Sequence, residues 1–198
     1  MARARRPTRP QRPNPAASPE LSPHRISARG NYHDPVQSHA RRSAAITALL
    51  VLFADQLSKA WAAASLPYGK QLSVISGLLW FRLLTNTGAT FSLLPGHNLL
   101  FSAATLLVLL AIGMILLRGY VSGALSLVAL GAVAGGALGN LVDRVRIAGV
   151  VDFIQVRFWP TDFNLADVAI RAGVVALLLG LLLERRRQPL SARPDSTA

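Results

Sequence analysis

The sequence contains no cysteine, and only one of its four histidines, His97, lies beyond residue 40. Without cysteine the chain has no disulfides, no thiolate metal sites and no cysteine nucleophile. A single histidine in the main part of the chain also disfavours a zinc site and a Ser-His-Asp triad. We therefore expect neither a metal nor another cofactor.

Charged residues are also scarce. They make up 15% of the 198 residues, whereas hydrophobic residues make up 52%. A typical soluble domain is about 25% charged, and a soluble chain this apolar would have too little polar surface to cover itself. The composition indicates a membrane protein, and no nucleic-acid partner is expected despite the formal charge of +12.

Much of the positive charge lies at the start of the chain. Residues 1–42 hold nine arginines against two acids, together with seven of the twelve prolines. Such a segment buries little apolar surface and is predicted to be a disordered basic cytoplasmic tail. The alternative is an arm that binds nucleic acid or anionic lipid. Residues 43–184 are predicted to form the membrane domain, and residues 185–198 a basic cytoplasmic C-terminal tail.

Four apolar segments, each about 20 residues long, can cross a hydrocarbon core of roughly 30 Å as helices. They are residues 43–64, 99–117, 121–141 and 164–183. Close helix–helix approach is predicted by four glycines of the third segment, Gly131, Gly135, Gly136 and Gly139. The expected fold class is an all-α membrane protein with four transmembrane helices. A small β-rich outer-surface segment is expected between the first two helices, at residues 72–91 around a turn at residues 86–88.

Arginines mark one end of the predicted helices. They are Arg41, Arg42, Arg118 and the run at residues 185–187. By the positive-inside rule, that end and both termini are expected to be cytoplasmic.

Between residues 43 and 183 the acids are all aspartates, and they lie at or near the outer ends of the predicted spans. They are Asp55, Asp143, Asp152, Asp162 and Asp167. Ionisable groups at membrane depth are costly and indicate function. Asp55 and Lys59 are four residues apart on one helix face, which favours an ion pair over direct chemistry. Asn140 and Arg144 have the same spacing, with Asp143 beside them. Spacing alone leaves open whether Asp143 and Arg144 support a site or form an interfacial cap.

Asp152 and Asp167 are candidates for acid/base chemistry. Asp152 stands in an apolar, β-branched run, which favours its protonated form. Asp167 opens the fourth helix, whose N-terminus favours a negative charge. Two acids held in different protonation states are what attack on a peptide bond requires. The alternative is that Asp167 is only a first-turn helix residue and Asp152 an interfacial loop residue.

Five sequence blocks, in order, resemble those of lipoprotein signal peptidase (signal peptidase II), a bacterial membrane aspartic peptidase family. The blocks are DQLSK (55–59), NTGATFS (86–92), GNLVDR (139–144), VVDF (150–153) and FNLAD (163–167). The resemblance covers residues 44–184, which makes this region a four-span peptidase domain. One departure is Thr90, where the family usually has alanine.

The resemblance implies the roles of the site residues. Asp152 and Asp167 match the catalytic pair, and Asn86 and Gly88 match positions that line the substrate cleft. The supporting positions are Asp55, Lys59, Asn140, Asp143, Arg144 and Asn164. Arg144 is expected to hold the loop that carries Asp152. Asp162 lies outside every block, so its replacement by asparagine is predicted to be close to neutral.

The implied reaction is removal of the signal peptide from diacylglyceryl-modified prolipoproteins, with cleavage on the N-terminal side of the lipidated cysteine. An aspartate pair and water would perform it at the outer face of the bacterial inner membrane, without metal or nucleotide. The expected partners are these substrates and membrane lipid. The alternative is a non-enzymatic four-span scaffold or lipid-binding protein, in which the aspartates only pair with Lys59, Arg144 and Arg171.

Overall fold

The structure is a computed structural model that describes residues 35–88 and 97–187. Within these ranges it contains four long helices, α1 (Pro35–Ser65), α2 (Asn98–Arg118), α3 (Ala124–Ile147) and α4 (Leu165–Arg187). Each is long and apolar enough to cross a membrane. The predicted all-α fold class with four spans is therefore confirmed.

Two helices extend beyond the predicted spans. Helix α1 begins at Pro35, inside the segment expected to be a disordered tail that ends at residue 42. Helix α3 continues to Ile147, past the predicted end at Leu141. The extension places Asn140, Asp143 and Arg144 on one continuous helix. Asp143 and Arg144 follow Asn140 by three and four residues, so both are its neighbours on the helix surface.

Three short antiparallel strands form a sheet in the described part of the chain, in the order β1 (Gln71–Ile75), β2 (Leu79–Asn86) and β3 (Val150–Val156). The prediction placed the turn at residues 86–88, but β1 and β2 are joined at residues 76–78, where Gly77 adopts a φ of 70°. Such a φ strains any residue with a Cβ, and this explains the turn's position. Strand β3, which carries Asp152, was not predicted. Thr90 lies outside the described residues.

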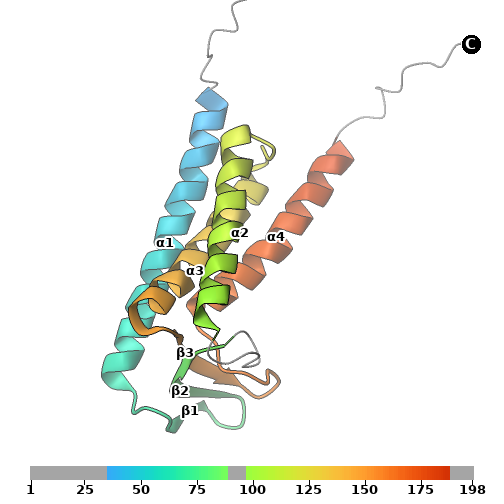
Figure 1. Cartoon of the computed structure of the whole chain (residues 1–198). Coiled ribbons are helices and arrows are strands. Elements are labelled where there is room, and N and C mark those ends of the chain that lie inside the picture. Colours follow the sequence, from blue (N-terminus) through green and yellow to red (C-terminus); the bar gives the residue numbers. More distant parts are fainter. Residues whose placement is uncertain (1–34, 89–96, 188–198) are drawn as a thin grey trace, which may run out of the picture. The chain divides into compact units, whose positions relative to one another are not determined.

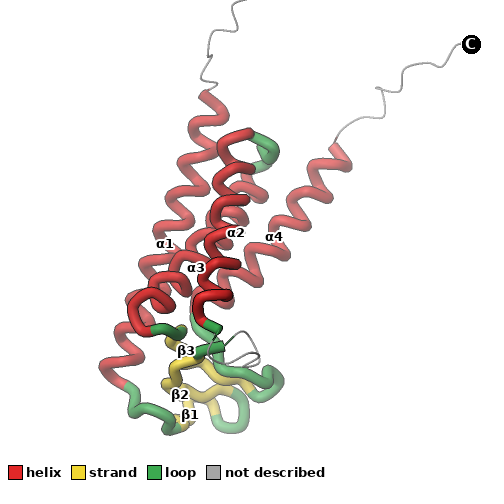
Figure 2. The backbone as a smooth tube through the Cα atoms, viewed as in Figure 1, coloured by secondary structure: helices red, strands yellow, loops and turns green. Residues whose placement is uncertain are grey.

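Helix α3 is the central helix, and it packs against α1, α2 and α4. Figure 1 shows the sheet at one end of the helices, while the start of α1 and the end of α4 lie at the other end. Figure 2 shows the same separation of strands from helices. Residues of α3 that meet the sheet therefore lie at the end opposite Arg41, Arg118 and Arg185.

Glycines of α3 bring the neighbouring helices close, as predicted. A Cβ on Gly131 would collide with the backbone carbonyl of Ala44 in α1, and one on Gly136 would collide with that of Ala166 in α4. Small residues permit this approach in the absence of a hydrophobic driving force between helices. On the outer surface large apolar side chains such as Leu50, Phe53 and Leu107 are exposed, as a lipid-facing surface requires.

An aromatic cluster attaches the sheet to the helices. The rings of Trp61 on α1 and Phe81 on β2 meet edge to face with centroids 5.5 Å apart, and Phe153 on β3 lies 6.3 Å from Trp61. Such pairs stabilise by about 0.5–1.5 kcal/mol each beyond their buried area. The side chain of Phe153 is buried in this cluster, so strand alternation turns its neighbour Asp152 to the other face.

Candidate active site

Asp152 is buried, with 3% of its surface exposed, on the face of strand β3 opposite to Phe153. Both carboxylate oxygens accept hydrogen bonds from asparagine amides. Asn164 Nδ2 donates to Oδ1 at 2.7 Å, and Asn86 Nδ2 donates to Oδ2 at 3.0 Å. Asn86 ends strand β2, whose pairing with β3 brings it beside Asp152. The predicted association of Asn86 with the site is therefore present.

Asp167 lies in the first turn of helix α4. Asn164 immediately precedes this helix, and its side-chain oxygen accepts the backbone N–H of Asp167 at 3.0 Å, as an N-cap residue does. Asn140 Nδ2, from helix α3, donates to Asp167 Oδ1 at 3.1 Å. Asp167 therefore lies at a helix N-terminus, with one amide donor directed at its carboxylate.

Two asparagines connect the two acids. Asn164 holds Asp152, Asn140 holds Asp167, and Asn164 Nδ2 also lies 3.3 Å from Asn140 Oδ1. Neither Asp152 nor Asp167 forms a salt bridge with any residue in the described ranges. Within those ranges no group of three metal-ligating side chains is present.

The environment of Asp152 changes its protonation. Burial is the largest effect and the negative charge of Asp167 is the second; together they raise the pKa of Asp152 to about 7. Hydrogen bonds from Asn86 and Asn164, and the positive charge of Lys59, act in the opposite direction. Asp152 is therefore protonated in a substantial fraction of molecules near neutral pH, which an ordinary aspartate is not.

Lys59 forms a buried ion cluster beneath the acids. Its ammonium group lies 2.7 Å from Asp55 Oδ2 and 2.9 Å from Asp143 Oδ2, and it donates to Asn140 Oδ1 at 2.9 Å. These three contacts account for all three ammonium donors. The predicted Asp55–Lys59 pair is thus confirmed, and Lys59 has no donor left for a substrate.

The two acids of this cluster also hold the backbone next to the candidate dyad. Asp143 Oδ2 accepts the N–H of Val151 at 3.1 Å, and Asp55 Oδ1 accepts the N–H of Ala166 at 2.9 Å. Val151 and Ala166 directly precede Asp152 and Asp167. The cluster therefore positions both acids through their chain neighbours.

The contacts of Arg144 differ from the prediction that it holds the segment carrying Asp152. Its guanidinium lies 5.8 Å from the ring centroid of Phe101 on α2, and Nη1 lies 3.5 Å from the carbonyl oxygen of Asn140. Among the described contacts, Asp143 rather than Arg144 holds the strand that carries Asp152. The helical spacing explains this outcome, because Asp143 and Arg144 point to different sides of α3.

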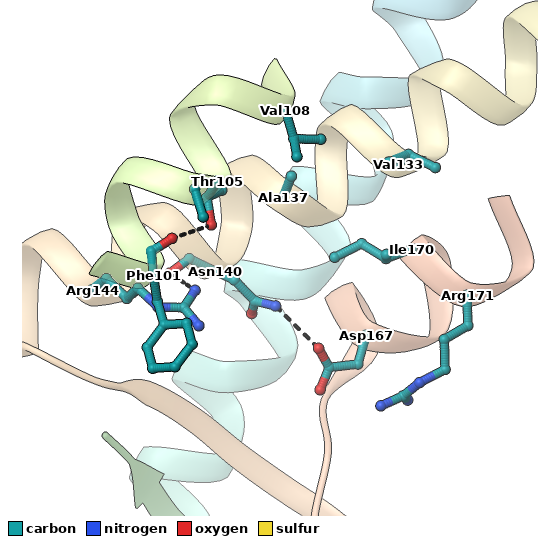
Figure 3. A pocket seen from close by; sticks show the side chains of 11 residues that line it. Phe101, Thr105, Val108, Val133, Ala137, Asn140, Arg144, Asp167, Ile170 and Arg171 are labelled. Atoms are coloured by element: carbon teal, nitrogen blue, oxygen red, sulfur yellow. Dashed lines mark hydrogen bonds between the residues drawn. The ribbon is translucent and has the colours of Figure 1, made fainter. Parts of the chain in front are cut away.

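A cavity of about 420 Å³ opens beside the acids between α2, α3 and α4. Figure 3 shows its apolar wall and, at one end, the polar side chains of Asn140, Arg144, Asp167 and Arg171. The apolar wall consists of Phe101, Ala104, Val108, Val133, Ala137 and Ile170, with Thr105. A smaller polar cleft of about 40 Å³ adjoins this end and is lined by Asn86, Gly88, Asn140, Arg144, Val150, Asp162, Asp167 and Arg171.

Several residues of the site were missed by sequence reasoning. Gln56 Nε2 donates to Asp143 Oδ1 at 3.1 Å, and its place beside Asp55 was a signal that was not used. Asp162, expected to lie apart from the site, lines the polar cleft and pairs with Arg82 of strand β2 at 2.5 Å. Arg171, four residues after Asp167, reaches the same cleft.

A family model described as signal peptidase (SPase) II matches residues 47–183. The lipoprotein signal peptidase of Syntrophomonas wolfei is 42% identical over 144 residues, covering 73% of this chain and 95% of its own. That of Moorella thermoacetica is 40% identical over 151 residues, with 73% and 97% covered.

Solved structures give the same fold. A bacterial membrane enzyme solved by the in meso method at 2.3 Å resolution superposes with a TM-score of 0.69 and 27% identity, covering 77% of this chain and 95% of its own. A second, at 1.9 Å, gives a TM-score of 0.65 and 29% identity, with 71% and 93% covered.

Proposed function

The chain belongs to the signal peptidase II family of multi-pass bacterial membrane peptidases, which are of the aspartic type, and we propose that Asp152 and Asp167 are its catalytic pair. The substrate is a diacylglyceryl-modified prolipoprotein. Cleavage occurs on the N-terminal side of the lipidated cysteine and releases the signal peptide. Membrane lipid is the second partner, because the large side chains on the outer surface of the helices are apolar.

The observation that carries this proposal is the connection of the two acids through Asn140 and Asn164, with a different environment for each acid. Asp152 is buried with a pKa of about 7 and serves as the protonated acid. Asp167 lies at a helix N-terminus and accepts an amide donor, so it serves as the base. This difference in protonation is the requirement for general acid/base work by paired carboxylates.

The proposed reaction returns each acid to its starting protonation state. Asp167 takes a proton from water while the water oxygen attacks the scissile carbonyl carbon. Asp152 donates its proton to the carbonyl oxygen and stabilises the tetrahedral intermediate. The carbon–nitrogen bond then breaks, the proton on Asp167 passes to the departing cysteine amine, and Asp152 recovers its own proton as the carbonyl re-forms.

The cavities suit the two parts of the substrate. The apolar wall of the larger cavity, between α2, α3 and α4, accepts acyl chains. The polar cleft, lined by Asn86, Asn140 and Asp167, accepts the peptide backbone. The two spaces share Asn140, Arg144, Asp167 and Arg171, so lipid and peptide meet beside Asp167.

The proposed orientation follows from the charge at the helix ends. Arg41, Arg118 and Arg185 lie at the end of the bundle away from the sheet. The positive-inside rule makes that end cytoplasmic. The sheet and the acids then lie at the outer face of the inner membrane, where a translocated prolipoprotein presents its cysteine.

The scaffold alternative predicted that the aspartates serve only as ion-pair partners of Lys59, Arg144 and Arg171. Lys59 does pair with two of them, Asp55 and Asp143. Within the described ranges Asp152 and Asp167 lack salt bridges, which favours a chemical role for them.

The test is cleavage of a diacylglyceryl-modified precursor peptide by purified Asp152→Asn and Asp167→Asn variants. Asparagine keeps the shape of the side chain but cannot exchange the proton, so each variant should lose at least about a thousandfold in rate. Glu184→Gln is the matched control, because Glu184 contacts Ser126 at the other end of the bundle. Substantial turnover by either aspartate variant, with the control unchanged, would overturn the assignment.

A further inference from the structure

Arg171 contacts two aromatic rings close to Asp167 and has unused hydrogen-bond donors. It lies one helical turn after Asp167 on α4, and its guanidinium stacks 4.9 Å from the ring centroid of Trp159 and 5.8 Å from that of Phe163. It forms no hydrogen bond or ion pair with any residue that the structure describes. Two aromatic rings therefore attract the guanidinium while its five N–H donors remain available.

Arg171 lies at the junction of the apolar cavity and the polar cleft described above. It lines both the apolar cavity and the polar cleft. Figure 3 shows its side chain extending from α4 toward the end of the helix that carries Asp167. Arg171 also lines a third, apolar space with its stacking partners Trp159 and Phe163. On the side of the first two spaces, a ligand group that binds Arg171 lies where an acyl chain in the cavity joins a peptide in the cleft.

Arg144 borders the same two spaces but is placed differently. Its guanidinium lies over Phe101, on the α2 side, and Nη1 approaches the carbonyl of Asn140. Arg144 therefore contacts the backbone of α3, whereas Arg171 contacts only aromatic rings among the described residues. This difference makes Arg171 the better candidate for a direct ligand contact.

We propose that Arg171 binds the ester carbonyl oxygens of the substrate's diacylglyceryl group and makes the enzyme selective for an ester-linked lipid. This inference rests on the proposed function. In a diacylglyceryl cysteine the two ester groups lie between the acyl chains and the peptide, and their carbonyl oxygens are strong acceptors. A guanidinium presents donors in a fixed fork and carries a charge, which makes such bonds stronger than those between neutral groups.

The test compares two lipopeptides that differ only at the lipid linkage. One carries the diacylglyceryl group, and the other carries a dialkylglyceryl group of equal chain length, in which ether oxygens replace the esters. The wild-type enzyme should cleave the ester substrate with a kcat/KM about tenfold higher, as expected for one charged hydrogen bond. Arg171→Met should lose about tenfold on the ester substrate and little on the ether substrate, so that the preference disappears.

Two further variants separate binding from structure. Arg157→Met is the matched control, because Arg157 is exposed and lines neither space. Its preference should equal that of the wild type. Trp159→Leu keeps Arg171 but removes one stacking ring, so it should reduce the ester preference in part. The ratio of kcat/KM on the ester and ether substrates can be measured with the wild-type enzyme alone, so this part of the test does not depend on any variant folding.

The outcomes distinguish this proposal from the one on which it rests. Equal cleavage of both substrates by the wild type, or an equal loss on both by folded Arg171→Met, would overturn the role of Arg171 and leave the peptidase assignment intact. Failure of the wild type to cleave either lipopeptide would overturn both proposals.

Discussion

The amide nitrogen of Asn164 donates a 2.7 Å hydrogen bond to Oδ1 of Asp152. The oxygen of the same side chain caps the helix that carries Asp167. Asn164 thus positions Asp152 by a direct hydrogen bond, and it positions Asp167 by capping the start of α4. Because Asn164 is fully buried, its side chain has little freedom to exchange these partners. The relative placement of the acids is built into the junction of β3 and α4.

Activity is expected to fall as the pH rises above about 7. The proposed reaction needs a protonated Asp152, whose pKa burial and the charge of Asp167 raise to about 7. Well above this value the protonated fraction falls about tenfold per pH unit. The measurement is kcat/KM for the lipidated peptide between pH 5 and 9, with Glu184→Gln giving the same profile. A rate that stays constant from pH 6 to 9 would contradict the assignment of the proton to Asp152.

The same pKa predicts how Asp152→Asn changes stability with pH. The pKa of Asp152 is raised in the folded protein, so its contribution to stability is fully present below about pH 4 and is lost as the pH rises through about 7. Asparagine has no proton to lose. The Tm of the variant, relative to the wild type, should therefore be higher at pH 8 than at pH 4. Thermal unfolding in detergent at both pH values checks this, and an equal Tm difference at both would refute it.

Much of the helical frame was predictable, because hydropathy and the spacing of Asp55 and Lys59 are local properties. The partners across the fold were not. Asp143 joins Lys59, and Asn140 joins Asp167, only because α3 packs against α1 and α4. Strand β3 escaped prediction since its short apolar run has no helix-like or alternating period of its own. Asp162 and Arg82 are distant in sequence, and neither motif nor spacing connects them.

Lys59→Met is expected to destabilise the protein strongly. It leaves the carboxylates of Asp55 and Asp143 buried without their cation, and breaking a buried pair costs about 3–5 kcal/mol. For a chain of this size the Tm should fall by roughly 10 °C. Adding Asp55→Asn and Asp143→Asn removes the uncompensated charges and should restore part of the loss. A single variant with an unchanged Tm would show that the cluster contributes little.

Asp162→Asn should have a small but measurable effect, which revises the near-neutral behaviour predicted from the sequence. Asp162 pairs with Arg82, and the connection that contains it leads directly to Asn164. Arg82 is 33% exposed, so water weakens the pair and the expected loss is about 1 kcal/mol or less. Cleavage should fall severalfold. The charge-swapped pair Arg82→Asp with Asp162→Arg should recover activity over either single variant, and no recovery would argue against a role for the ion pair.

Arg144→Lys should reduce cleavage far more than stability. Lysine keeps the positive charge but loses the planar fork that lies over Phe101 and approaches the carbonyl of Asn140. Asn140 in turn donates to Asp167, so a change at Arg144 is transmitted to this proposed catalytic acid through one residue. A displacement of about 1 Å at a reacting group can cost on the order of a hundredfold in rate.

The matched control for this variant is Arg146→Lys. Arg146 lies on the same helix, is exposed, and lines neither the apolar cavity nor the polar cleft. Cleavage rate and Tm are measured for both variants side by side. If Arg144 acts on the site, only Arg144→Lys loses activity, and its Tm stays close to that of the wild type. Equal and small changes in both quantities would instead identify Arg144 as an interfacial anchor, because a cation alone is sufficient for that role and lysine supplies one.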